Sequence, residues 1–276
     1  MPMDPYFLIF EILMYGLLAW SLVDARQRIG WHGVGQVMAG VLFGILLEWA
    51  TIQQLHAYRY GRFAIMIAGE VPLAIGVGWG VIIYASRLYA DSTTLPRWSK
   101  PILAALLALN IDLSMDAIAI RLGMWDWGQG LAFQYFGVPW ANFWAWFWVV
   151  STFTAGLWFL ADRPYPWSRW LGPWVAMVVG VIGVLATNRL IVSIVPRSLY
   201  EATIAVVMLA ALGLVRWLRP RIVARPLPPL SRWTPFTFHI YFLAAGLISG
   251  VIFQPPILLV VSLAMAGVAW RLHRNR

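Results

Sequence analysis

Cysteine is absent from this 276-residue chain, and charged side chains are scarce. Without cysteine the chain has no disulfide, thiolate metal site, iron–sulfur cluster or cysteine nucleophile. Only 11% of the residues are charged, whereas soluble domains carry roughly 25%. A chain with so little charge and 61% hydrophobic residues cannot cover a globule with polar surface. The composition therefore predicts an integral membrane protein.

Motifs for cofactors and metals are also missing. The single lysine, Lys100, lies at a loop boundary beside Pro101, so no span offers a lysine for a retinal Schiff base. No phosphate loop, nucleotide fingerprint or Ser-His-Asp pattern occurs. The four histidines are scattered, with no pair at the helical spacing of haem or zinc ligands: His32, His56, His239 and His273. We therefore expect neither a cofactor nor a metal.

Long apolar runs predict membrane-spanning helices, because one span needs roughly 20 apolar residues. We predict spans at residues 6–23, 33–50, 63–85, 102–120, 140–161, 170–188, 199–215, 237–253 and 257–271. The last two are separated only by Gln254, Pro255 and Pro256, so they form a tight hairpin, a re-entrant pair or one broken helix. The expected fold is an all-α polytopic bundle of eight or nine spans, with residues 1–276 as one membrane domain.

The net charge of +9 is read as a topology signal rather than as a nucleic-acid surface. With nine spans and the N-terminus outside, 15 of the 20 Lys and Arg residues lie on the cytoplasmic side and 5 outside, against 12 and 8 for eight spans. The positive-inside rule thus favours nine spans with a cytoplasmic C-terminus. The expected location is the cytoplasmic membrane. The stretch 216–235 holds five Arg and five Pro and is predicted to be a cytoplasmic loop beside anionic lipid.

Acidic residues inside the predicted spans are functional candidates, because a charge in hydrocarbon is costly. Asp112 and Asp116 are the sharpest pair, since a spacing of four places both on one helix face. Two carboxylates so close repel, so one of them is expected to hold a proton and to serve as a general acid. The alternatives are hydrogen bonds to neighbouring helices or an ion pair with Arg121. Asn110 lies on another side of the helix and need not join the pair.

Three further acids lie in predicted spans. Glu48 ends the second span and is followed by Tyr58 and Tyr60. Glu70 stands two residues before Pro72, where a broken helix could expose backbone carbonyls to a cavity. Glu11 stands alone, and we expect it to be structural.

Residues 123–150, GMWDWGQGLAFQYFGVPWANFWAWFWVV, are densely aromatic. An interfacial belt accounts for several of these tryptophans. It does not account for their density or for the amide of Asn142. Aromatic faces stabilise a cation by about 0.5–2 kcal/mol each without trapping it as a nucleophile would. An aromatic wall beside acids therefore suits a long polyene or an isoprenoid cation.

Four blocks in order carry a family resemblance: Glu48 with YRYG at 58–61, VPLAIGVGWGVIIY at 71–84, IDLSMD at 111–116 with LGMWDW at 122–127, and YFGVPWANFWAW at 135–146. Over residues 48–146 the chain resembles the membrane carotenoid biosynthesis proteins that include the carotenoid 1,2-hydratases and bisanhydrobacterioruberin hydratase. The resemblance implies water addition to, or rearrangement of, a terminal polyene double bond, started by protonation and without a redox cofactor. The expected partners are a carotenoid or other isoprenoid, membrane lipid and other carotenoid biosynthesis enzymes.

Roles can be assigned to named residues on this hypothesis. Asp112 and Asp116 would transfer the proton, and Glu48 would act as a second acid or orient water. The residues expected to position water or the polyene end are Tyr58, Tyr60, Tyr135 and Asn142. Those expected to line the pocket are Trp79, Trp125, Trp127 and Trp146.

Two other functions stay open. Acids at membrane depth and Gly-rich, Pro-broken helices also suit a proton-coupled transporter, although no inverted repeat is visible. A non-catalytic protein that binds carotenoid and returns it unchanged is the third hypothesis.

Overall fold

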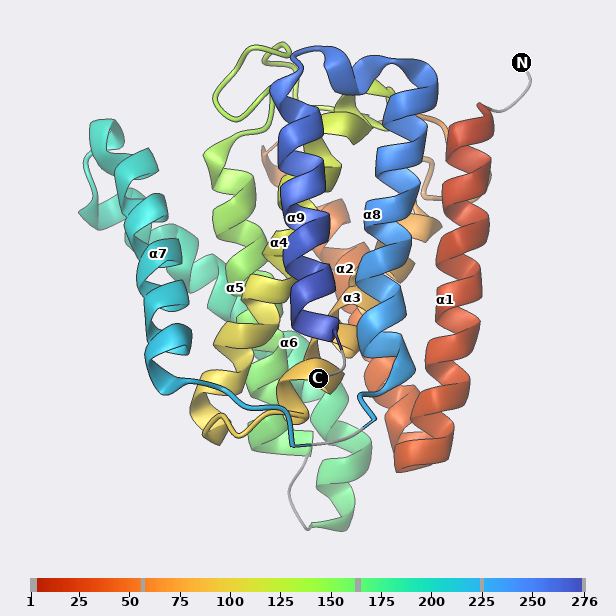
Figure 1. Cartoon of the computed structure of the whole chain (residues 1–276). Helices are drawn as coiled ribbons and strands as arrows, with labels where there is room; N and C mark the ends of the chain where they lie inside the picture. The colour runs from red at the N-terminus through yellow and green to blue at the C-terminus, as the bar shows by residue number, and fades with distance from the viewer. Residues whose placement is uncertain (1–3, 56–57, 162–164, 224–225, 275–276) are drawn as a thin grey trace.

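The computed structural model describes residues 4–55, 58–161, 165–223 and 226–274. Over these residues the chain folds into nine α-helices that pack side by side as one bundle (Figure 1). The helices are α1 Pro5–Ile29, α2 Trp31–Leu55, α3 Leu73–Asp91, α4 Lys100–Arg121, α5 Trp140–Gly156, α6 Pro166–Ile194, α7 Tyr200–Leu218, α8 Pro229–Ser249 and α9 Ile257–His273. The prediction of an all-α polytopic bundle is confirmed.

Seven helices in the described part of the chain, α1 to α7, are long and apolar enough to cross a membrane, judged by length and composition. α8 does not reach that apolarity, and α9 has only 17 residues. α1 and α9 begin at the same end of the bundle (Figure 1). The exact number of spans and the orientation in the membrane stay predictions.

Two predicted boundaries are wrong. The span predicted at 63–85 begins only at Leu73, because residues 66–72 form a hairpin of β2 (Met66–Ile67) and β3 (Val71–Pro72). Gly69 adopts a positive φ of 76° in its turn, a conformation that glycine tolerates best. The loop predicted at 216–235 is also shorter, since α8 already begins at Pro229 and proline fits the first turn of a helix.

The last two helices form the hairpin alternative. α8 and α9 are separate helices joined by a short 3-10 turn at Val251–Phe253, and they run side by side in opposite directions (Figure 1).

Glycines bring α2 and α3 into close contact. Gly40 and Gly44 on α2, and Gly76 and Gly80 on α3, each repeat at a spacing of four, the small-residue pattern of packed membrane helices. A Cβ at Gly40 would lie 3.2 Å from the Cα of Gly80. A Cβ at Gly44 would lie 2.5 Å from the Cβ of Trp79. The close approach therefore lets the Trp79 indole lie against α2.

Two short strands from distant loops pair over one end of the bundle. β1 (Arg59–Tyr60) is antiparallel to β4 (Trp125–Asp126), with Tyr60 opposite Trp125. The Gly61 amide donates to the Met124 carbonyl at 2.9 Å and extends the pairing. The pairing fixes the tyrosines that follow α2 beside the tryptophans that follow α4.

Candidate functional site

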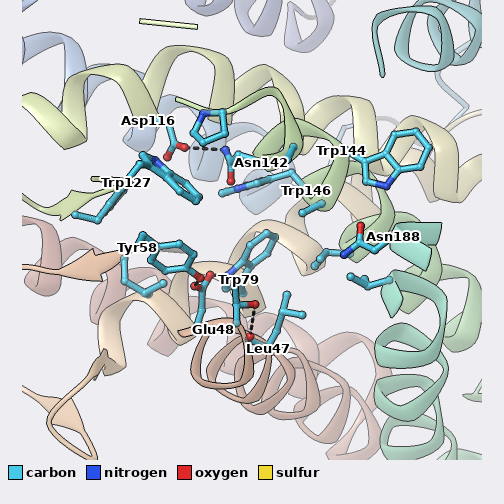
Figure 2. Close-up of a pocket in the computed structure, with 18 of the residues that line it drawn as sticks. Leu47, Glu48, Tyr58, Trp79, Asp116, Trp127, Asn142, Trp144, Trp146 and Asn188 are labelled. Carbon is cyan, nitrogen blue, oxygen red and sulfur yellow. Dashed lines mark hydrogen bonds between the residues drawn. The ribbon is translucent and has the colours of Figure 1, made fainter. Parts of the chain in front are cut away.

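A cavity of about 710 Å³ is lined mainly by residues of α2 to α7 and, at one end, by residues of the β1–β4 pair. Figure 2 shows part of this lining. Nine of the eleven side chains predicted for the site line it: Glu48, Tyr58, Tyr60, Trp79, Asp116, Trp125, Trp127, Asn142 and Trp146. Glu48 and Asp116 are the only charged side chains among the described lining residues. The cavity is thus an apolar, ring-lined space with two acids.

Glu48 is held by three hydrogen-bond donors. Its carboxylate accepts from the Trp79 indole at 2.7 Å, from the Tyr60 hydroxyl at 2.8 Å and from the Tyr58 hydroxyl. The side chain is buried, so these donors replace the water that the carboxylate would otherwise bind. The arrangement fixes the carboxylate in one orientation at the cavity wall.

The two tyrosines that hold Glu48 lie outside the spanning segments. The phenols of Tyr58 and Tyr60 both have a pKa well above the ordinary value. Burial is the larger cause, and the charge of Glu48 raises the pKa further. Both hydroxyls are therefore protonated donors at neutral pH.

Asn142 bridges the aspartate pair from the neighbouring helix. Its Nδ2 lies 2.7 Å from Asp116 Oδ2 and 3.1 Å from Asp112 Oδ2 (Figure 2). Asp116 faces the cavity, whereas Asp112 lies one turn further into α4, is fully buried and does not line the cavity. Asp112 Oδ1 accepts no hydrogen bond from any residue that the structure describes. The predicted pair is therefore a layered one, with one carboxyl at the wall and one behind it.

The ion pair with Arg121 that the sequence left open is not formed. The Arg121 guanidinium donates to backbone carbonyls of Gln254, Ala117 and Phe136 at 2.6, 2.8 and 2.7 Å. Neither Asp112 nor Asp116 forms an ion pair with any residue that the structure describes.

Aromatic rings form the rest of the inner wall. Trp79 and Trp146 lie 4.2 Å apart between ring centroids, and Tyr58 and Trp127 lie 4.7 Å apart. The Trp127 Nε1 is buried and has no hydrogen-bond partner within the described part of the chain. Ring faces next to two carboxyl groups can stabilise positive charge without offering a nucleophile.

The acids and the bridging amide lie near one end of the bundle. Asp116 is five residues before the end of α4, and Glu48 is seven before the end of α2, about 8 and 10 Å at 1.5 Å per residue. Asn142 lies in the first turn of α5, at the same end. In the predicted orientation this end faces outside.

The cavity reaches the outer surface of the bundle at α6. Leu185 and Val192 line it and are also 58% and 60% exposed. Tyr200 and Ile204 of α7 line the same part of the cavity. Since both helices are apolar enough to span, the opening faces the expected position of lipid.

Other predicted candidates lie away from the cavity. The Tyr135 hydroxyl donates to the Leu113 carbonyl at 2.8 Å and does not line the space. Glu11 is buried and accepts from the Ala64 amide at 2.9 Å, so it holds the loop before α3 in place, as expected of a structural residue. Glu70 lies in the β2–β3 turn rather than in a span and accepts a hydrogen bond from Gln53.

The opposite face of α4 carries a second polar cluster that the sequence did not indicate. His239 Nε2 lies 3.0 Å from Asn110 Oδ1, and its Nδ1 lies 3.0 Å from Ser114 Oγ. Asn110 also donates to the Met265 carbonyl at 3.1 Å. Asn110 thus binds α8 and α9 rather than the aspartates, and the cluster fixes the rotation of α4.

Sequence reasoning missed many of the cavity residues, and two of these carry polar groups at one end of the cavity. Asn188 on α6 and Trp144 on α5 line the end away from Glu48 (Figure 2). Asn188 is the last residue of a predicted apolar span, and its amide was the one available signal. Trp144 was one of many tryptophans in its segment, so nothing distinguished it.

Among the described residues, no group of three or more His, Asp or Glu side chains could hold a metal ion. The cavity lining itself includes carboxyl groups, phenols and aromatic faces.

Comparisons with curated proteins and with solved structures gave no match. The family model described as "Carotenoid biosynthesis protein" matches residues 3–212. The match is wider than the resemblance seen at 48–146 and covers α1 to α6 and most of α7, including every cavity residue named above. The chain therefore belongs to the carotenoid biosynthesis protein family.

Proposed function

We propose that this protein adds water to a terminal double bond of a carotenoid or related isoprenoid within the membrane. One observation carries the proposal most: the buried Asp112–Asp116 pair, bridged by Asn142, presents Asp116 to a ring-lined cavity in which Glu48 is the other acid. Two adjacent carboxyl groups in an apolar site cannot both keep a charge cheaply, so they share one proton. That proton is available to an olefin in the cavity.

The reaction starts at Asp116, the member of the pair at the wall. Its proton adds to one carbon of the double bond, the π electrons form the new C–H bond, and the other carbon becomes a tertiary cation. The faces of Trp79 and Trp146 stabilise this cation. The aspartate pair is left with one more negative charge.

Water then attacks the cation through its oxygen and forms the C–O bond. Glu48, whose carboxyl group is oriented by three donors, accepts the proton that this water loses. Return of the proton to the aspartate pair closes the cycle, so one water is added and nothing is oxidised or reduced. If the cation loses a neighbouring proton instead, the product is an isomer.

The test is expression in a host that accumulates lycopene, with mass analysis of the pigments. A pigment heavier by one water supports hydration, and an isomer of unchanged mass supports rearrangement. The double variant Asp112→Asn/Asp116→Asn is expected to abolish turnover while the protein stays in the membrane with its pigment bound. An unchanged product yield in this variant would overturn the mechanism.

The same preparation separates the other two functions. Carotenoid that copurifies unchanged, with no product in the host, identifies a binding protein. Proton-driven uptake of a solute into proteoliposomes, without any change in the pigments, identifies a transporter. Either result overturns the proposed hydration.

A further inference from the structure

Asn188 is a polar residue without a partner in an apolar helix. Its carboxamide forms no hydrogen bond with any residue that the structure describes. The adjacent Thr187 shows how a polar side chain in a helix is usually satisfied, since its hydroxyl donates to the Gly183 carbonyl one turn earlier at 2.9 Å. The amide lines the cavity, where a polar atom of a bound molecule can satisfy it and lipid tails cannot. The amide is therefore expected to have a ligand.

Trp144 supplies a second unpaired donor at the same place. The side chain is only 5% exposed, and its Nε1 has no hydrogen-bond partner among the described residues. Figure 2 shows Trp144 and Asn188 together at one end of the cavity, with Glu48, Asp116, Tyr58 and Trp127 at the other. The cavity thus has two polar ends separated by apolar walls.

The chemistry of this end limits what it can bind. A carboxamide both donates and accepts, and an indole N–H donates. Among the described lining residues there is no Lys, Arg or His to hold a carboxylate or phosphate, and the two acids, Glu48 and Asp116, lie at the opposite end. The surrounding Leu185, Ile191 and Val192 are apolar. The pattern fits a neutral oxygen on a hydrophobic chain.

We propose that Asn188 and Trp144 form a second binding subsite, which holds a hydroxyl or keto group on the part of the isoprenoid away from its reacting end. Asn188 is then a specificity-determining residue that selects oxygenated isoprenoids over pure hydrocarbons. The inference depends on the proposed function only for the class of ligand, an isoprenoid. It can be tested by measuring binding, with no need for turnover.

The experiment measures binding of lycopene and 1-hydroxylycopene to the purified full-length protein in lipid nanodiscs. Every protein compared carries Asp112→Asn/Asp116→Asn so that lycopene is not hydrated, and wild type here refers to residue 188. A second pair of shorter ligands, geranylgeraniol and the matching C20 hydrocarbon, tests an oxygen that lies closer to the reacting end of the chain. Bound ligand is quantified by chromatography after gel filtration. For at least one pair, the wild type is expected to bind the alcohol roughly tenfold more tightly, as one net hydrogen bond allows.

The decisive variant is Asn188→Leu, which keeps the size and removes the amide. It should lose the preference for the alcohol and keep its affinity for the hydrocarbon, whereas Asn188→Gln should retain part of the preference. Thr187→Val, which alters a neighbouring polar residue outside the cavity, should leave the preference unchanged.

The outcomes separate the two proposals. Equal affinity of the wild type for both members of each pair, or a preference that survives in Asn188→Leu, overturns the subsite and leaves the hydration proposal standing. A wild type that binds neither hydrocarbon nor alcohol overturns both.

Discussion

The Trp79 indole on α3 donates a hydrogen bond of 2.7 Å to the Glu48 carboxylate on α2. The bond is possible because residue 44, one turn before Glu48, has no side chain. A Cβ there would lie 2.5–2.8 Å from three Trp79 atoms. The glycine that packs the two helices therefore also positions a side chain of the site.

Gly44→Ala should displace Trp79 and so disturb both the packing and Glu48. We expect a loss of about 1–3 kcal/mol in stability, the usual cost of overpacking, and loss of carotenoid turnover. Gly35→Ala on the same helix is the matched control, because its Cβ would meet nothing within 4 Å. Thermal unfolding in detergent and pigment analysis measure both variants. Equal behaviour of the two would contradict the packing role.

Asp116→Asn and Asp112→Asn should differ in their effect. Asp116 borders the cavity, so its neutral isostere should lower turnover about 100-fold or more, the range of general acid catalysis. Asp112→Asn should lower turnover less, because Asp112 lies behind Asp116 and acts on the substrate only through it. Product per membrane-inserted protein is the measurement. A larger loss in Asp112→Asn would reverse the assignment of the proton donor.

Tyr60 should make stability depend on alkaline pH. Burial, and then the Glu48 charge, raise the pKa of its phenol, so the folded protein holds that proton more tightly than the unfolded chain. The stabilisation is therefore complete below the ordinary phenol pKa of about 10 and decreases as pH rises above it. The unfolding temperature of the wild type should fall more steeply above that pH than that of Tyr60→Phe. Tyr165→Phe, at an exposed position, should behave like the wild type.

A bulky label at the mouth of the cavity should block substrate uptake from the bilayer. The chain has no cysteine, so Leu185→Cys gives one reactive site there. Ile182→Cys is the matched control on the same helix, since the two native side chains are 58% and 59% exposed but Ile182 does not line the cavity. After reaction with a large lipophilic maleimide, only the Leu185→Cys protein should bind lycopene more slowly. Equal rates would place the route elsewhere.

The helices could be predicted because each apolar run is long enough to indicate a membrane-spanning helix by its length. The start of α3 could not, because residues 63–72 are mostly apolar whether they form a helix or a hairpin. The pairing of β1 with β4 was also beyond prediction, since strands of two residues carry no periodic pattern. Their pairing nonetheless brings Tyr60 and Trp125 to the cavity.

Many residues of the candidate site were predicted from residue type and spacing, but which of their side chains reach the cavity was not. A spacing of four places Asp112 and Asp116 on one face, yet it does not say which of them reaches the cavity. Tyr135 belongs to the aromatic segment, but its hydroxyl binds a backbone carbonyl instead. Asn188 escaped notice because one amide in an apolar run does not reveal the direction in which it points.

The acids lie within about 10 Å of one end of the bundle, and this shallow position has a consequence for the product. A hydrocarbon polyene dissolves among the acyl chains, but an alcohol formed here by the proposed hydration would start nearer to the ester and glycerol layer of one leaflet than to the middle of the bilayer. Its new hydroxyl can hydrogen-bond there as soon as it leaves the protein. Release into that layer would then favour departure over rebinding and would fix which leaflet the hydroxylated end occupies.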